Sequence, residues 1–285
     1  MAALVTLTTD FGTRDAWVAA MKGVLWGVAR AAGREIHVVD VTHEIAPHAV
    51  AEAALALEAA APWFPQGTIH LAVVDPGVGT ARRGLVVAAA GQLFVGPDNG
   101  LFTAAFANAD WRAWALEAPE YRLPAVSRTF HGRDVFAPAA AHLALGLEAD
   151  RLGRAVVDPV RLRWPAAEAT EDCVSGVVVH VDRFGNLVTS IPAGVVAALG
   201  PGARVRVAGR VLPLVGTYAD LPAGRAGALI GSGGRLEIAV DRRRAANLLA
   251  ARRGTPVVVS RPSSTTERRR ASSTAPTTGR ASRRR

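Results

Sequence analysis

Short apolar runs alternate with longer amphipathic stretches along the first part of the chain. A short apolar run bounded by turn residues predicts a strand, whereas apolar residues that recur every three or four positions predict a helix. In chain order, the pattern predicts a strand at 4–9, a helix at 15–32, a strand at 36–41, a helix at 48–61 and a strand at 69–74. Alternating strands and helices are typical of a parallel sheet with right-handed crossovers.

The pattern becomes shorter and less regular after residue 84. It predicts two short strands at 85–89 and 93–96 and a helix at 135–147. Residues 156–167 are rich in proline and arginine without periodicity, which is typical of a connection between domains. Beyond them, strand candidates separated by glycine and proline indicate a small β-domain, and they lie at 174–181, 204–207, 210–214, 228–230, 236–240 and 256–260.

These elements predict the domain organisation of the chain. We expect an amino-terminal parallel-sheet α/β domain at 1–160, a linker at 161–173 and a smaller carboxy-terminal β-domain at 174–260. The final segment, 261–285, holds eight arginines and one glutamate among serine, threonine and alanine. Because so few apolar side chains cannot repay the entropy of folding, this segment is predicted to be a disordered basic tail.

The net charge of +9 raises the question of nucleic-acid binding. Most of that charge lies in the tail, so we expect a solvated extension and no specific nucleic-acid partner. The single cysteine, Cys173, favours a reducing compartment. No apolar stretch is long enough to span a membrane, and the first residues lack the basic region of a signal peptide. These features predict a cytoplasmic protein without a membrane partner.

A carboxylate follows each of two predicted strands, and a histidine lies in a glycine-flanked loop. Asp10 follows the first strand and Asp75 the third, and His131 lies in the loop. Ligands of open α/β sheets bind at the carboxyl ends of the strands, so these side chains can converge at one edge. In the stretch TIHLAVVDPGVGTARRG, a glycine-rich turn returns Arg82 towards Asp75. The alternative interpretation of this stretch is a surface Asp-Pro-Gly turn with a solvated arginine pair.

Sequence signatures of several other site classes are missing. The histidines His37, His43 and His48 raise a metal-site hypothesis, but the chain has no HExxH, paired CxxC or His-x-His spacing, so we predict no metal. Its glycine-rich turns lack the GxGxxG order and the Walker Lys-Ser/Thr end, which argues against dinucleotide or P-loop binding. No GxSxG motif marks a serine nucleophile. We expect no cofactor.

Six segments carry a resemblance to a known family. In order, they are TTDFGTRDAWVAAMKGV, VVDPGVGTARRG, PDNGLF, TFHGRDVFAPAAAHLA, VDRFGNLVTSI and GRLEIAV, and the resemblance spans roughly residues 4–260. The chain resembles the S-adenosyl-L-methionine (SAM) hydroxide adenosyltransferase family, which is related to the bacterial fluorinase and chlorinase. The resemblance implies hydrolysis of SAM to adenosine and L-methionine without a metal. It also implies a homotrimer whose sites lie between the amino-terminal domain of one subunit and the carboxy-terminal domain of the next.

The site residues of the family are carried over where the motifs match. The catalytic aspartate, arginine and histidine correspond to Asp75, Arg82 and His131. The substrate-binding residues correspond to Asp10, which would hold the ribose, and to Asp15, Phe130, Asp182, Phe184, Asn186, Tyr218, Ser232, Glu237 and Val240. In the mechanism that this implies, a water lies in line behind the ribose 5′ carbon, Arg82 and His131 favour its hydroxide-like form, and Asp75 orients the pair.

Two alternatives to the hydrolase remain open. The first is a SAM-dependent halogenase of the same family. The halogenating members carry an inserted loop after the first aspartate motif and lack the intact triad, whereas Arg83 leads directly into the next strand. The second alternative is a non-catalytic protein that binds adenosine or SAM. The chain also departs from the family pattern at Ser190, Gly231 and Gly233, near the residues assigned to the methionine end of the substrate.

Overall fold

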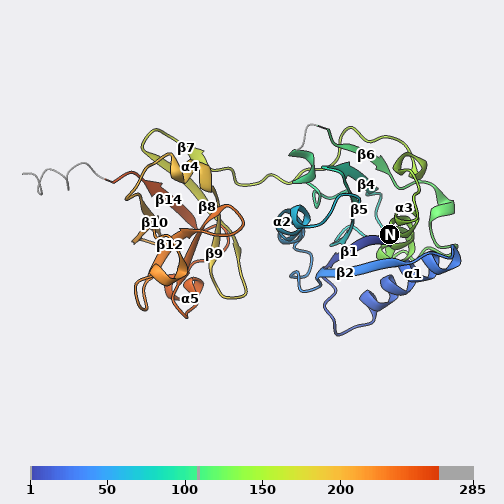
Figure 1. The fold of residues 1–285 in the computed structure, drawn as a ribbon, viewed down its shortest axis with the longest axis horizontal. Coiled ribbons are helices and arrows are strands. Elements are labelled where there is room, and N and C mark those ends of the chain that lie inside the picture. The colour runs from blue at the N-terminus through green and yellow to red at the C-terminus, as the bar shows by residue number, and fades with distance from the viewer. Residues whose placement is uncertain (1, 108–109, 263–285) are drawn as a thin grey trace, which may run out of the picture. The chain divides into compact units, whose positions relative to one another are not determined.

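The computed structural model describes residues 2–107 and 110–262, which form two compact units divided between Arg163 and Trp164 (Figure 1). An amino-terminal α/β unit is followed by a smaller β unit, which confirms the predicted fold class. The predicted basic tail lies outside the described residues from 263 onward. Within the described part of the chain, no helix is both long and apolar enough to cross a membrane.

Six strands form the sheet of the amino-terminal unit, in the order β2-β1-β3-β5-β4-β6. They are β1 (Ala3–Thr9), β2 (Ile36–Thr42), β3 (Ile69–Val73), β4 (Gly84–Ala89), β5 (Gln92–Pro97) and β6 (Arg112–Ala115). The strands β2, β1, β3 and β5 pair in parallel, as predicted, but β4 is antiparallel to β5 and β6. The sheet is therefore mixed at one edge, because only Ala90 and Gly91 join β4 to β5 and such a short connection links antiparallel neighbours.

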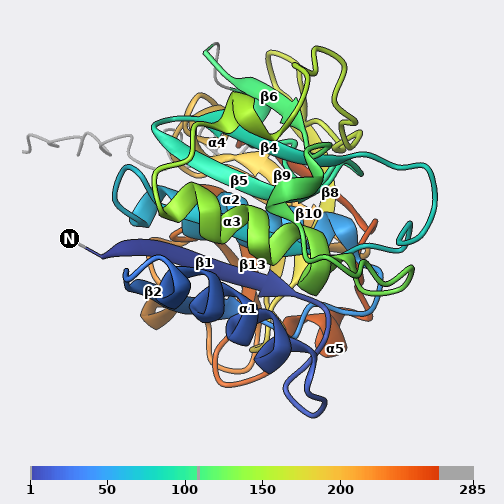
Figure 2. The same ribbon diagram turned by 90° about the vertical axis from the view of Figure 1, so that its right-hand side faces the viewer.

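Helices cover both faces of this sheet (Figure 2). They are α1 (Trp17–Ala31), α2 (Val50–Ala60) and α3 (Ala137–Ala144), with shorter 3₁₀ turns at Ala61–Trp63, Ala105–Ala107, Pro119–Tyr121 and Ala149–Leu152. Helices α1 and α3 pack on one face through a core that includes Met21 and Leu25, and α2 packs on the other through Ala53 and Leu57. Both faces of β3 are covered, which explains why that strand is apolar almost throughout.

The starts of the three predicted helices need correction. The first helix begins at Trp17, and Ala16 rather than Asp15 precedes it, without a side-chain cap. The second begins at Val50, because His48 adopts a left-handed conformation with a φ of 66°, which a right-handed helix cannot contain. The third is preceded by a single π turn, Gly132–Phe136, so the helical segment starts earlier than predicted. Single π turns occur frequently at functional sites.

The β unit is an antiparallel sheet in the order β11-β10-β14-β8-β9-β13-β12, with β7 paired to β8. Its elements are β7 (Glu168–Ala169), β8 (Cys173–Val181), β9 (Leu187–Pro192), α4 (Ala193–Ala197), β10 (Arg204–Val207), β11 (Arg210–Pro213), a 3₁₀ turn (Tyr218–Asp220), β12 (Ala226–Ile230), β13 (Arg235–Val240), α5 (Ala245–Leu249) and β14 (Pro256–Ser260). The two edge strands, β11 and β12, approach each other. A hydrogen bond joins them just beyond β11, where the Val215 N–H donates to the Ala228 carbonyl at 2.8 Å. The unit is therefore nearly a closed barrel.

Lowering the pH is expected to destabilise the amino-terminal unit through His70. This residue is fully buried on β3, with Nδ1 2.8 Å from Thr6 Oγ1 and its ring stacked on Phe94. Burial lowers the pKa of His70 from 6.5 to about 4. Between these values the unfolded chain binds a proton that the folded protein excludes, so the free energy of unfolding decreases as the pH falls from 6.5 to 4, by about 3 kcal/mol in total.

Urea unfolding at a series of pH values measures this loss. The variant His70→Gln cannot titrate and should lack this part of the pH dependence. His37→Gln is the matched control, because His37 is exposed on β2, and it should keep the dependence of the wild type. Equal pH dependence in the wild type and in His70→Gln would contradict the assignment.

Candidate active site

Two neighbouring strands bring Asp10 and Asp75 to the same edge of the sheet. Strands β1 and β3 are parallel, with Thr9 opposite Val73. Asp10 directly follows Thr9, and Asp75 lies just beyond Val73. A cavity of about 330 Å³ at this edge is lined by Asp10, Asp75 and His131 together. The convergence expected from the strand ends is therefore present.

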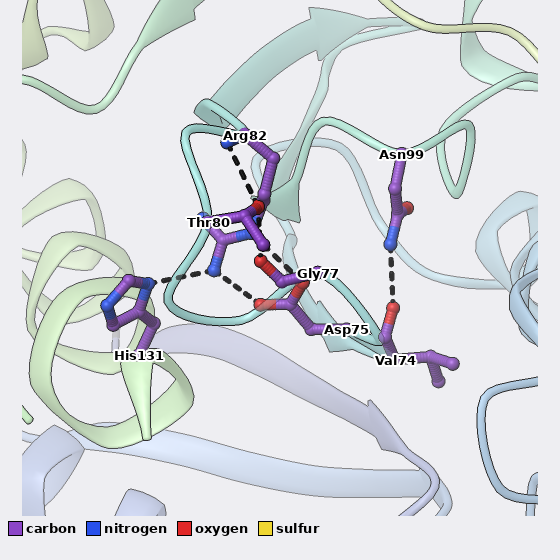
Figure 3. A network of polar contacts seen from close by, with 7 residues as sticks. All are labelled: Val74, Asp75, Gly77, Thr80, Arg82, Asn99 and His131. Atoms are coloured by element: carbon purple, nitrogen blue, oxygen red, sulfur yellow. Dashed lines mark hydrogen bonds and ion pairs between the residues drawn. The ribbon is translucent and has the colours of Figure 1, made fainter. Parts of the chain in front are cut away.

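Arg82 joins Asp75 and His131 into one network (Figure 3). Its Nε donates to Asp75 Oδ1 at 2.9 Å, and its Nη2 donates to Asp75 Oδ2 in a second short contact. The same Nη2 lies 2.8 Å from His131 Nδ1. The side chains of Asp75 and Arg82 are only 5% and 13% exposed, so this bidentate ion pair is largely shielded from solvent. The surface turn with solvated arginines is thus the wrong interpretation of this stretch.

The contact with Arg82 determines the protonation of His131. A guanidinium can only donate, so Nδ1 of His131 must accept, and the proton of the neutral ring is on Nε2. Burial, followed by the positive charge of Arg82, lowers the pKa of His131 below its ordinary value. The ring is therefore neutral near pH 7, and the nitrogen that Arg82 leaves free is a hydrogen-bond donor.

The loop between Asp75 and Arg82 is fixed by close backbone packing and by its own hydrogen bonds. Gly79 has a φ of +79°, and a Cβ there would lie 2.6 Å from the Arg128 carbonyl, so only glycine fits where the loop meets the segment before His131. Thr80 Oγ1 accepts the Arg82 N–H at 3.3 Å. The guanidinium of Arg82 also lies over the Phe136 ring, 5.1 Å from its centroid. These contacts hold the guanidinium in one orientation.

The cavity is also lined by residues that the sequence analysis did not assign to the substrate site. Trp17, half exposed, packs edge-on against the predicted Phe130, with ring centroids 5.2 Å apart. His48 also lines the cavity, and its N–H donates to Asp10 Oδ2 at 2.8 Å. Trp17 lies inside the first of the six matched motifs, and this position could have indicated its place in the site. Asp15 is exposed in the turn before α1 and is not among the residues that line the cavity, so its role stays a prediction.

Four of the predicted residues of the β unit form two hydrogen-bonded pairs, Asp182 with Asn186 and Tyr218 with Glu237. Asp182 accepts the Asn186 N–H at 2.8 Å and the Asn186 side-chain amide at 3.1 Å, within the turn that joins β8 to β9. Tyr218 donates its hydroxyl to Glu237 Oε1 at 2.5 Å. Burial, opposed by the hydrogen bond from Tyr218 and reinforced by the charge of Asp182, raises the pKa of Glu237. Phe184, at the tip of the turn, is 75% exposed.

The glycine at 231 makes room for this carboxyl group. A Cβ at Gly231 would lie 2.5 Å from Glu237 Oε2, so the departure from the family pattern has a local structural reason. Ser232 is exposed in the turn between β12 and β13, while Val240 belongs to the hydrophobic core of the unit. Their assigned roles stay predictions. Among residues 2–107 and 110–262, no cluster of histidine, cysteine, aspartate and glutamate side chains is arranged to hold a metal ion.

Comparison with known proteins places these features in a family. The chain matches the models of the SAM hydroxide adenosyltransferase N-terminal domain at residues 5–153 and C-terminal domain at residues 176–258. A protein of Thermus thermophilus named (R)-S-adenosyl-L-methionine hydrolase is 45% identical over 254 residues, which cover 86% of this chain and 94% of the relative.

Two further comparisons give the range of the similarity. The crystal structure of an uncharacterized conserved protein from Thermotoga maritima superposes with a TM-score of 0.84 at 32% identity, covering 90% of this chain and 100% of that chain. A fluorinase of Actinopolyspora mzabensis is more distant, at 29% identity over 86% of this chain and 92% of the relative. The protein thus belongs to the SAM hydroxide adenosyltransferase family.

Proposed function

We propose that the protein hydrolyses SAM to adenosine and L-methionine. The observation that carries this proposal is the shielded network of Asp75, Arg82 and His131 beside the cavity that Asp10 lines. The relative at 45% identity is named a hydrolase of this substrate, whereas the fluorinase is at 29%. Family membership and site chemistry therefore favour the same reaction.

The reaction needs a positioned nucleophile more than it needs activation of the leaving group. Water attacks the ribose 5′ carbon, the carbon–sulfur bond breaks, and its electron pair neutralises the sulfonium to give the thioether of methionine. Holding the oxygen in line behind that carbon converts the attack into an effectively unimolecular step. Asp10 is suited to accept hydrogen bonds from the two ribose hydroxyls and so to fix the electrophile.

The protonation of His131 supports a division of roles within the network. Because Arg82 occupies Nδ1, His131 can offer the water oxygen only the Nε2–H, which stabilises negative charge as that oxygen becomes hydroxide-like. Asp75 is then the member of the network that can accept the proton that the attacking water loses. From Asp75 this proton passes on to solvent. His131 therefore acts as a donor and not as the general base.

We also propose that the active enzyme is a cytoplasmic homotrimer, with each site shared between the amino-terminal unit of one subunit and the carboxy-terminal unit of the next. The support is the exposure of the predicted ligand-binding aromatics in the β unit. Phe184 is 75% and Tyr218 50% exposed, as side chains that await a ligand and a second subunit would be. Light scattering coupled to gel filtration tests the trimer, and a monomer that turns over SAM would exclude it.

The proposed activity is tested with the purified full-length chain and SAM. Chromatography should detect adenosine and methionine in equal amounts, well above the uncatalysed background. The same incubation in chloride or fluoride buffer tests the halogenase alternative, which would yield a 5′-halo-5′-deoxyadenosine. Saturable binding of SAM without any product would instead support the non-catalytic alternative.

A further inference from the structure

The loop that carries Asp10 is held by the segment that follows β2. The Gly12 N–H donates to the His43 carbonyl at 2.7 Å, and the His48 N–H donates to Asp10 Oδ2 at 2.8 Å. A third contact joins the residue before Asp10 to the His43 ring, with Thr9 Oγ1 2.9 Å from Nδ1. His43 thus contacts the chain on both sides of Asp10.

The other bonds of these groups define a polar chain that runs to the surface. Thr9 Oγ1 accepts the Phe11 N–H at 3.2 Å, and its own hydrogen is available to His43 Nδ1. With the Thr9 hydroxyl as donor, the N–H of the His43 ring is on Nε2. On that side Asp40 Oδ1 lies 3.0 Å from Nε2, at an ion-pair distance but off the direction of a regular hydrogen bond. Asp40 also accepts from Lys22 Nζ at 2.7 Å.

Asp40 provides a fixed negative charge at the outer end of this chain. Partial burial raises its pKa, but the hydrogen bond from Lys22 and the close contact with the His43 ring outweigh burial and lower the pKa below its ordinary value. His43 itself is only 4% exposed and is not among the residues that line the cavity. A buried imidazole loses its hydration, and this costs free energy unless protein groups contact its nitrogens. Thr9 and Asp40 supply these contacts.

We propose that His43, oriented by Asp40, is a positioning residue that aligns the Asp10 carboxylate with the ribose hydroxyls of the substrate. The inference rests on the proposed function, in which Asp10 holds the ribose. The two ribose hydroxyls lie on adjacent carbons at a fixed spacing, so the Asp10 carboxylate must be held in one position to bind both. A misplacement of a binding group by about 1 Å is enough to lower a reaction rate by roughly a hundredfold. The ligands that depend on His43 are nucleosides with free 2′ and 3′ hydroxyls.

The experiment compares the affinities of adenosine and 2′,3′-dideoxyadenosine, measured by calorimetry on the full-length chain. The wild type should prefer adenosine by at least about tenfold. His43→Gln places its amide near the position of Nε2, so it can reach Asp40 but not Thr9, and it should lose most of that preference. His43→Asn places its amide near the position of Nδ1, so it can reach Thr9, and it should restore most of the preference.

Two further variants complete the test, one at Asp40 and one as a control. Asp40→Asn changes a partly exposed side chain without changing its size, and it should lower the preference about two- to threefold with thermal stability retained. His37→Gln, on the exposed His37 of the same strand, should leave the preference unchanged. Equal weakening of both nucleosides in His43→Gln would show a merely structural role and overturn the proposal, as would an intact preference or a wild type that has none.

The design separates this inference from the proposed function. Nucleoside binding requires no turnover, so a preference that depends on His43 would support the positioning role even if SAM were not hydrolysed. If the wild type turned over SAM but the preference for adenosine were the same with and without the His43 ring, the hydrolase proposal would stand and the positioning role would be refuted.

Discussion

Arg82→Lys is expected to lower the turnover of SAM by about a hundred- to a thousandfold, the loss typical of removing a preorganised donor from a charge-stabilising site. Lysine keeps the positive charge but not the planar fork that reaches both Asp75 oxygens and His131 Nδ1 at once. Without that fork, His131 loses the contact that holds its proton on Nε2. The affinity for adenosine should stay nearly unchanged, because Arg82 is not among the residues that line the cavity.

The neighbouring arginine is a matched control for this prediction. Arg83 lies next in the chain, but its guanidinium binds Asp98 and Asp158 and takes no part in the network of Asp75. Arg83→Lys should therefore keep the turnover of the folded protein within about twofold of the wild type. Single-turnover rates at saturating SAM and calorimetric adenosine affinities measure both effects. If Arg82→Lys lost adenosine affinity while its saturated rate stayed intact, the network would hold substrate rather than the nucleophile.

The part of the site that lies at the ends of strands could be predicted from the sequence. The apolar runs before Asp10 and Asp75 predict two strands, and parallel neighbours bring their carboxyl ends to one edge. Arg82 lies in the loop after Asp75, so its return to that carboxylate is a local event. The position of the proton on His131 Nε2 could not be predicted from the sequence, because it depends on a contact between Arg82 and His131, which are 49 positions apart.

The parts that the sequence did not reveal depend on tertiary contacts or on short, mixed patterns. Strand β6, Arg-Ala-Trp-Ala, has only three consecutive apolar residues and no β-branched residue, so its pattern alone does not predict a strand. It is a strand because it pairs with β4. His48 lies in a stretch with helical composition, yet it adopts a left-handed conformation and its N–H binds Asp10. His43 was considered only as a possible metal ligand, because its partners Thr9 and Asp40 come together only in the folded sheet.

Asp10→Ala is expected to weaken adenosine binding by about 10- to 150-fold, the equivalent of roughly 1.5 to 3 kcal/mol for a charge-assisted contact. It should also slow turnover at saturation, because the 5′ carbon is no longer held in line with the nucleophile. The affinity for 2′,3′-dideoxyadenosine should change little, since that nucleoside lacks the hydroxyls in question. Calorimetry with both nucleosides measures this, and equal weakening of the two would show that Asp10 supports the fold of the cavity rather than the ribose.

The double variant of Asp10→Ala with His43→Gln then decides whether His43 acts through Asp10. Two residues that act independently give additive losses of binding free energy, whereas a positioning residue has nothing left to position once its target is gone. The double variant should therefore bind adenosine about as weakly as Asp10→Ala alone, although His43→Gln by itself weakens the wild type about tenfold. The loop contacts from Gly12 and His48 do not involve the altered His43 ring, so they are available in both backgrounds. Additive losses in the double variant would place the effect of His43 outside the ribose contact and refute its positioning role.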